Sequence, residues 1–116
     1  MQTYVIYHNP KCSKSRATLE LLQEKNVNVE IVEYLDNPPT GHQLKRILSL
    51  LNYQPIDLIR RGEDVFSALN LDGPTTTEDQ LVSAMIANPI LIERPIVLCG
   101  NRAIIGRPPE QVLDLL

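Results

Sequence analysis

The sequence predicts an α/β fold in which one mixed sheet consists of a β-α-β half and a β-β-α half, separated by a central helical insertion. Three observations predict it. Two short runs rich in β-branched residues flank an amphipathic segment near the N-terminus, and two further apolar runs meet at a turn near the C-terminus. Between these halves, apolar residues recur at helical spacing.

The first half of the chain is expected to form a strand, a helix and a second strand. Thr3–Tyr7 is β-branched and aromatic, which suits a buried strand. Residues 13–25 then carry alanine and leucine at helical spacing, and residues 29–34 return to an alternating strand pattern. Because crossovers of this kind are right-handed and join parallel strands in nearly all cases, we expect the two strands to be parallel.

The middle of the chain is predicted to be helical. Prolines and a glycine in residues 37–41 break the strand pattern, and leucine and isoleucine then follow at i, i+3, i+4 and i+7 from Leu44 to Leu51. Short helical stretches are expected at 56–59 and 64–69. Residues 77–80 have the form of a capping box that opens another helix. These elements make up the helical insertion.

The second half is expected to close with a hairpin and a last helix. The apolar runs 96–99 and 103–105 flank turn residues 100–102, and Pro108–Glu110 then opens the helix. The buried side of this helix is predicted to consist of Val112, Leu113 and Leu116. A β-α-β unit followed by β-β-α around one mixed sheet is the element order of a thioredoxin-like fold.

Size and charge limit the classes of function. The chain has 116 residues, 43% of them hydrophobic, so we expect one domain over residues 1–116 with one core. A net charge of -3 argues against a nucleic-acid partner or an anionic membrane surface. No apolar run is long enough to cross a bilayer. The N-terminal residues lack the features of a signal peptide, and we expect a cytoplasmic protein.

The two cysteines, Cys12 and Cys99, lie far apart in the sequence, which gives neither a disulfide framework nor the paired spacing of a zinc site. We therefore expect no metal. Cys99 ends an apolar strand beside a turn, where a structural role is expected. A lone cysteine is often a small buried hydrophobe, but the polar residues 10–15 around Cys12 argue against that reading of it.

Cys12 is the candidate nucleophile because it lies between the first strand and the first helix. The helix N-terminus presents backbone N–H groups without intrahelical partners, and this favours a thiolate. His8, Lys11 and Lys14 are expected to add positive charge, although His8 is equally compatible with a surface position at the strand end. Ser15 is expected to donate a hydrogen bond to the sulfur.

Several segments resemble the glutaredoxin-dependent arsenate reductase family, and the resemblance extends over nearly the whole chain. The nine consecutive residues His8-Asn9-Pro10-Lys11-Cys12-Ser13-Lys14-Ser15-Arg16 look like the active-site segment of that family, which makes the resemblance specific. The other similar segments are Tyr34–Pro39, Leu58–Arg60, Asn88–Ile96 and Gly106–Pro108. The family implies a thioredoxin-like core with a helical insertion, in agreement with the pattern of the elements.

The resemblance implies that Cys12 attacks arsenate while three arginines hold the oxyanion. The matching positions are Arg60, Arg94 and Arg107. Planar guanidinium groups suit this role because they bind oxyanions bidentately. Taken alone, each arginine reads as a surface charge, and only the resemblance selects Arg60 over Arg61.

The resemblance also implies the source of the electrons. Ser15 stands where thioredoxin-type motifs have their second cysteine, so Cys12 cannot close a short disulfide and the reductant comes from outside. The family supplies it as glutathione, a co-substrate, and glutaredoxin, a protein partner, with no bound cofactor. Pro95 follows Arg94 at a strand start, where thioredoxin-like folds commonly carry a cis-proline, and a cis bond is expected although trans is the commoner state of any X-Pro bond.

Two other functions remain open from the sequence. Related thiol-based transcriptional regulators share this fold and an N-terminal cysteine but bind RNA polymerase. Three converging guanidinium groups favour the enzyme, since a regulator has no evident need for them. The second alternative is a reductase-like protein with another thiol substrate.

Overall fold

The computed structural model describes residues 2–116 and divides into two compact units. The first unit combines the N-terminal segment up to Asn37 with Arg94–Leu116, and the second is Pro38–Glu93. The second unit is therefore inserted in the sequence between the two halves of the first, as the helical insertion was predicted to be. That residues 1–116 act as one domain stays a prediction.

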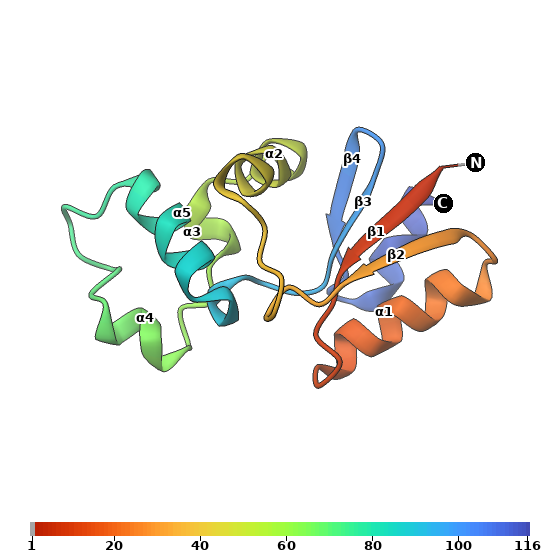
Figure 1. The fold of residues 1–116 in the computed structure, drawn as a ribbon, viewed down its shortest axis with the longest axis horizontal. Coiled ribbons are helices and arrows are strands. Elements are labelled where there is room, and N and C mark those ends of the chain that lie inside the picture. The colour runs from red at the N-terminus through yellow and green to blue at the C-terminus, as the bar shows by residue number, and fades with distance from the viewer. Residues whose placement is uncertain (1) are drawn as a thin grey trace. The chain divides into compact units, whose positions relative to one another are not determined.

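A four-stranded mixed sheet forms the centre of the first unit (Figure 1). Its strands are β1 (Thr3–Tyr7), β2 (Asn28–Val32), β3 (Ile96–Cys99) and β4 (Arg102–Ile105), in the order β2-β1-β3-β4. β1 is parallel to β2 and antiparallel to β3, and β3 is antiparallel to β4. The predicted parallel pair, the mixed sheet and the thioredoxin-like element order are confirmed.

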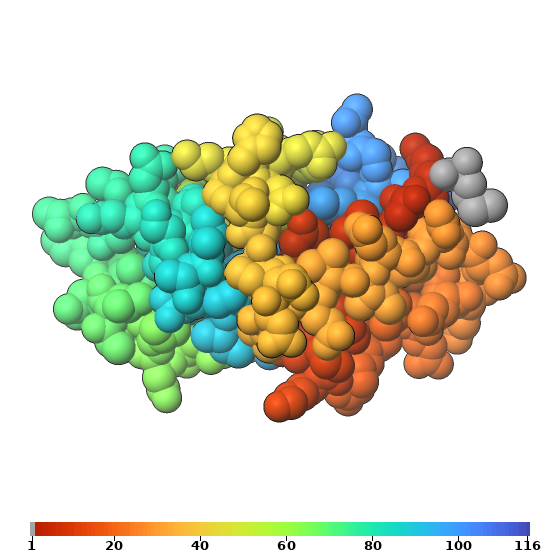
Figure 2. Space-filling view, in the orientation of Figure 1, coloured from red at the N-terminus to blue at the C-terminus, as the bar shows by residue number. Residues whose placement is uncertain are grey.

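Two helical elements pack with this sheet around one apolar core. They are the α-helix α1 (Ser13–Glu24) and the 3₁₀ helix η2 (Pro109–Leu115). The buried members of the core are Tyr4, Ile6, Leu22, Val97, Cys99, Val112 and Leu115. Figure 2 shows side chains of α1 and β2, in orange, at the surface of the same unit. β1 contributes Tyr4 and Ile6 to this core and α1 contributes Leu22, so the loop between them joins two packed elements.

The buried face of the last helix differs from the prediction. Val112 and Leu115 are buried, whereas Leu113 and Leu116 are 40% and 46% exposed. The reason is the 3₁₀ conformation of η2, in which side chains three residues apart lie above one another. The prediction of Leu113 and Leu116 as core residues was wrong because it assumed a different helical period.

Smaller differences concern element ends and the peptide bonds of two prolines. β2 ends at Val32, and Arg102 pairs with Cys99, which leaves Gly100 and Asn101 as the hairpin turn. Gly100 has φ +60°, a conformation that glycine adopts without steric cost. The Arg94–Pro95 bond is cis, as expected, and the bond before Pro108 is also cis.

The second unit is helical, as predicted. It contains α2 (Gly41–Leu51), α3 (Pro55–Leu58), α4 (Asp64–Ala68), α5 (Glu78–Ala87) and the 3₁₀ turn η1 (Pro89–Leu91). The capping box at Thr77 and Gln80 is present, and Thr40 with Gln43 forms a second one at the start of α2. Within residues 2–116, no helix is long and apolar enough to span a membrane.

Candidate active site

Cys12 is the N-cap residue of α1, at the end of the loop that follows β1. Its N–H donates to the carbonyl of Asn9 at 3.0 Å, and its own carbonyl accepts from the N–H of Arg16 at 3.0 Å. The thiol makes no capping hydrogen bond and is 9% exposed. The sulfur thus lies at the positive end of the helix, as the sequence predicted, and it does not cap the helix.

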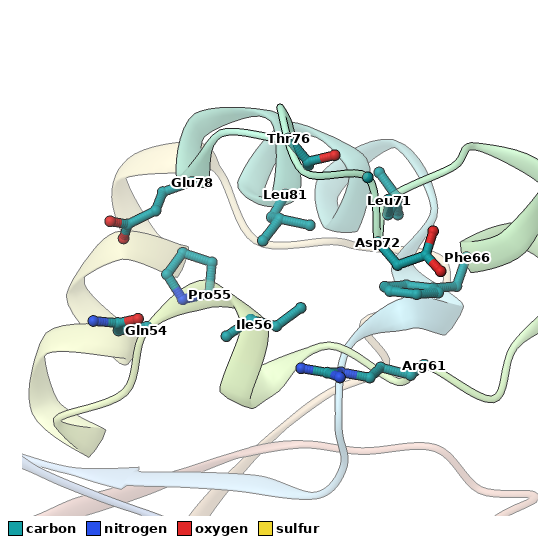
Figure 3. Close-up of a pocket in the computed structure, with 11 residues that line it drawn as sticks. Gln54, Pro55, Ile56, Arg61, Phe66, Leu71, Asp72, Thr76, Glu78 and Leu81 are labelled. Carbon is teal, nitrogen blue, oxygen red and sulfur yellow. The ribbon is translucent and has the colours of Figure 1, made fainter.

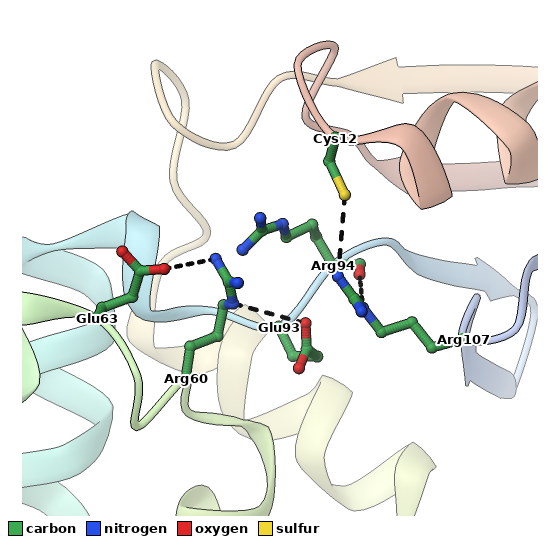
Figure 4. A network of polar contacts seen from close by, with 6 residues as sticks. All are labelled: Cys12, Arg60, Glu63, Glu93, Arg94 and Arg107. Carbon is green, nitrogen blue, oxygen red and sulfur yellow. Dashed lines mark hydrogen bonds and ion pairs between the residues drawn. The ribbon is translucent and has the colours of Figure 1, made fainter.

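Arg107 brings a second source of positive charge to the sulfur. Its Nη2 lies 3.9 Å from Sγ of Cys12, and its Nε donates to the carbonyl of Arg94 at 2.9 Å. Figure 4 shows the side chains of Arg94 and Arg107 on the side to which the thiol points. The structure therefore brings together three of the predicted site residues, Cys12, Arg94 and Arg107, which all belong to the first unit.

The position of Arg107 depends on the glycine before it. The N–H of Gly106 donates to the carbonyl of Pro95 at 2.9 Å. A Cβ at Gly106 would overlap Oγ1 of Thr18 and lie 2.7 Å from Cγ of Pro95. Thr18 itself is fully buried and donates to the carbonyl of Lys14 at 2.8 Å. Only a residue without a side chain lets the segment that carries Arg107 approach α1 this closely.

The substitution Gly106→Ala is expected to destabilise the protein by about 1–3 kcal/mol, because the added methyl group enters a filled site. Urea unfolding followed by circular dichroism would measure this loss as a lower midpoint at unchanged slope. Gly62→Ala is the matched control, since a Cβ there meets nothing within 4 Å. Equal midpoints for the two variants would show that Gly106 is not tightly packed.

Ser15 and His8 form a buried polar pair beside Cys12. His8 Nδ1 lies 2.7 Å from Oγ of Ser15, which also accepts the N–H of Asn9 at 3.0 Å. The structure shows the Ser15 hydroxyl on these two groups and gives no hydrogen bond from it to the sulfur, contrary to the prediction. Sequence reasoning missed Asn9, whose side chain accepts the N–H of Lys11 at 3.0 Å and so shapes the loop.

His8 is 7% exposed, so its surface reading was wrong. Burial lowers its pKa from the ordinary value of 6.5, and nearby Arg16 lowers it further, while the carboxylate of Glu33 acts in the opposite direction. The imidazole is therefore held neutral near pH 7. It supports the loop by pairing with Ser15 and does not add the positive charge that the sequence suggested.

Protonation of His8 is expected to make the protein less stable in acid. The folded pKa lies below the unfolded one, so the unfolded chain binds more protons once the pH falls below about 6.5. The contribution of His8 to the free energy of unfolding is fully present above that pH. Below it, this contribution declines by at most about 1.4 kcal/mol per pH unit for one proton. Urea unfolding between about pH 8 and pH 5 should show a shallower decline for His8→Gln. The exposed His42, changed to glutamine, is the control and should keep the wild-type decline.

Arg60 belongs to the second unit, where two carboxylates flank it. Its Nη1 lies 2.7 Å from Oε2 of Glu63, and its Nε lies 3.8 Å from Oε1 of Glu93 (Figure 4). Arg61, by contrast, is exposed. The structure thus distinguishes Arg60 from Arg61, which the sequence pattern alone could not do. The role of Arg60 toward the oxyanion stays a prediction.

The second unit also contains a pocket of about 340 Å³ between α3, α4 and α5 (Figure 3). Its floor is apolar, with Ile56, Phe66 and Leu81, and Arg61 and Asp72 lie at its rim. None of the predicted site residues lines it.

Cys99 is placed away from Cys12. It pairs with Tyr4 at the beginning of β1, whereas Cys12 follows the end of that strand. Its side chain is buried in the core, and its Sγ lies 3.4 Å from Oε1 of Gln2. Both cysteines are free thiols. These contacts are those of a core residue, as the sequence indicated.

Known proteins resemble this chain over nearly its whole length. Residues 7–115 match the model of the ArsC family. The chain is 47% identical over 112 residues to a protein of Escherichia coli (strain K12) named YfgD, covering 96% of this chain and 94% of that protein. It is 44% identical to the arsenate reductase of Neisseria meningitidis serogroup A, covering 96% of each. The solved structure of an arsenate reductase from Vibrio cholerae has 44% identity and a TM-score of 0.94, covering 99% of this chain and 98% of that one.

Proposed function

The chain belongs to the ArsC family, and from that premise we propose that it reduces arsenate to arsenite through a thiolate at Cys12. The observation that carries the proposal is the guanidinium of Arg107 at 3.9 Å from the sulfur. We propose that this cation binds the oxyanion that the sulfur attacks. Relatives named arsenate reductase at 44% identity support the choice of oxyanion.

The arginines are proposed to bind the substrate. Arsenate carries one to two negative charges near neutral pH and presents several oxygens, which guanidinium groups bind in pairs. Arg94 and Arg107 are proposed to hold it beside Cys12, and Arg60 to supply a third guanidinium. His8 and Ser15 support the loop that carries the nucleophile, through the pair described above.

Two external thiols supply the electrons in this proposal. Cys12 displaces water from arsenate and forms an arsenic–sulfur bond, and the glutathione thiol displaces a second water to bond to the same arsenic. The glutaredoxin thiolate then attacks the sulfur of glutathione, which breaks that arsenic–sulfur bond, leaves its electron pair on arsenic and forms a mixed disulfide. Water hydrolyses the remaining bond, so that arsenite leaves and the thiol of Cys12 is regenerated. Overall, arsenate and two thiols give arsenite, a disulfide and water, so no bound cofactor takes part. The buried position of Cys99 supports an external reductant, since that thiol has no path to Cys12 without unfolding of the core. We propose the cytoplasm as the compartment, because glutathione keeps thiols reduced there.

The test is arsenate-dependent oxidation of NADPH in a coupled assay with glutathione, glutathione reductase and glutaredoxin. The proposal expects turnover with the complete mixture and none when either glutathione or glutaredoxin is left out. Turnover without glutaredoxin would overturn the proposed partner alone. No turnover of arsenate by the wild-type protein would overturn the proposed reaction, and the RNA polymerase-binding regulator or another thiol substrate would take its place.

A further inference from the structure

The guanidinium of Arg60 is held by acidic side chains on both of its edges. Glu63 Oε2 lies 2.7 Å from Nη1, within the range of a strong charge-assisted hydrogen bond, and Glu93 Oε1 lies 3.8 Å from Nε. The side chains of Arg60, Glu63 and Glu93 are only 24%, 28% and 30% exposed. Glu63 is therefore the closer of the two partners, and the pair is partly shielded from water.

The backbone that carries these side chains is itself fixed by hydrogen bonds. An antiparallel bridge joins Ile59 to Ile92. Next to it, the N–H of Arg60 donates to the carbonyl of Leu91 at 2.7 Å, and the N–H of Glu93 donates to the carbonyl of Leu58 at 2.9 Å. Arg60 and Glu93 thus lie on two paired segments, and Glu63 is tied to the first of them because its N–H donates to the carbonyl of Arg60 at 3.3 Å.

We infer that Glu63 is a positioning residue that orients Arg60 for the oxyanion before the substrate binds. The inference rests on the proposed function. Glu63 takes one N–H of Nη1, and Glu93 faces Nε, which leaves both N–H bonds of Nη2 for oxygens of the substrate. A partly exposed ion pair contributes little to stability, so the main consequence of this one is the direction of the guanidinium. An oriented guanidinium loses less conformational entropy when it binds an anion.

The first experiment measures the KM for arsenate in the coupled assay. Glu63→Ala is expected to raise KM about five- to tenfold with little change in kcat, because a binding contact is lost equally in the ground and transition states. Glu63→Gln should restore KM to within about twofold of wild type, because the amide oxygen accepts the same hydrogen bond. Asp64→Ala removes a neighbouring exposed carboxylate and is the control for loss of local negative charge. An unchanged or lower KM in Glu63→Ala would overturn the inference, and so would an equal rise in KM in Asp64→Ala.

The second measurement asks whether Glu63 acts through Arg60. In the Arg60→Ala background, the further change Glu63→Ala should have no effect on KM, because the group that it orients is gone. Undiminished effects of Glu63→Ala in this background would overturn the inference. Arg61→Ala is the matched background in which the effect should persist.

A third readout is independent of turnover. In nitrogen-15 spectra, the Nη1 protons of Arg60, which face Glu63, should exchange with water faster in Glu63→Ala than in wild type or Glu63→Gln. Equal exchange in all three proteins would overturn the positioning role even if arsenate is reduced. If the wild-type protein does not turn over arsenate but exchange is still faster in Glu63→Ala, the proposed function is overturned. The conclusion that Glu63 orients Arg60 is then kept.

Discussion

The substitution Cys12→Ser is expected to abolish arsenate turnover in the coupled assay while the protein keeps its fold. Serine preserves the shape of the side chain, but its hydroxyl is a far weaker nucleophile than a thiolate and cannot form the arsenic–sulfur bond. We expect a loss of at least about a thousandfold, down to the background of the mixture. The thiol makes no capping hydrogen bond, so unfolding free energy should change by no more than about 1 kcal/mol.

The matched control for this prediction is Cys99→Ser, the same sulfur-to-oxygen change at the other cysteine. Cys99 is packed in the core at the opposite end of β1, so this variant should keep its turnover, with some loss of stability from the buried hydroxyl. Full activity of Cys12→Ser would remove Cys12 from the mechanism. Loss of activity in a folded Cys99→Ser protein would mean that Cys99 takes part in the electron transfer.

The substitution Arg107→Ala has the second largest expected effect. It removes the guanidinium that lies 3.9 Å from the sulfur of Cys12 and is anchored on the carbonyl of Arg94. A charge-assisted hydrogen bond is worth about 1.5–3 kcal/mol, so kcat/KM for arsenate should fall about 10- to 150-fold. Arg94→Ala should cause a loss of the same order. Arg107→Lys should recover only part of the loss, because an ammonium group keeps the charge without the paired donors.

Arg102→Ala is the control for the loss of one positive charge from the same unit. Arg102 is an exposed residue of β4 that donates to the carbonyl of Asp114, and its removal should leave kcat/KM unchanged. Steady-state kinetics at varied arsenate concentration distinguish the variants. An unchanged dependence on arsenate concentration in Arg107→Ala would exclude Arg107 from the oxyanion site.

The secondary structure could be predicted largely from the sequence because its causes are local. Alternation in Thr3–Tyr7, the apolar stripe from Leu44 to Leu51 and the capping box at Thr77 each depend on residues a few positions apart. The last helix was the exception. Its 3₁₀ form, and with it the burial of Leu115 in place of Leu113, follows from packing against α1 and β4 and not from the local sequence.

The polar contacts around the nucleophile were less accessible to sequence reasoning. His8 and Ser15 were both chosen, yet their pairing with each other depends on burial, which a polar segment does not indicate. The sequence gives no sign that Thr18, a polar residue of α1, is fully buried against Gly106. The only sign of this close packing in the sequence is the glycine before Arg107. Its importance depends on how closely the segment that carries it approaches α1.

The sequence by itself determined that Cys12 follows a strand and begins a helix, since the residues that form both elements are its neighbours in the chain. Only the tertiary structure decided that Arg107, 95 residues further on, lies against its sulfur. The physical reason is that this contact requires β3 to pair with β1, the hairpin to return along β3, and Gly106 to pack on α1. No local preference of either residue specifies those three long-range packings.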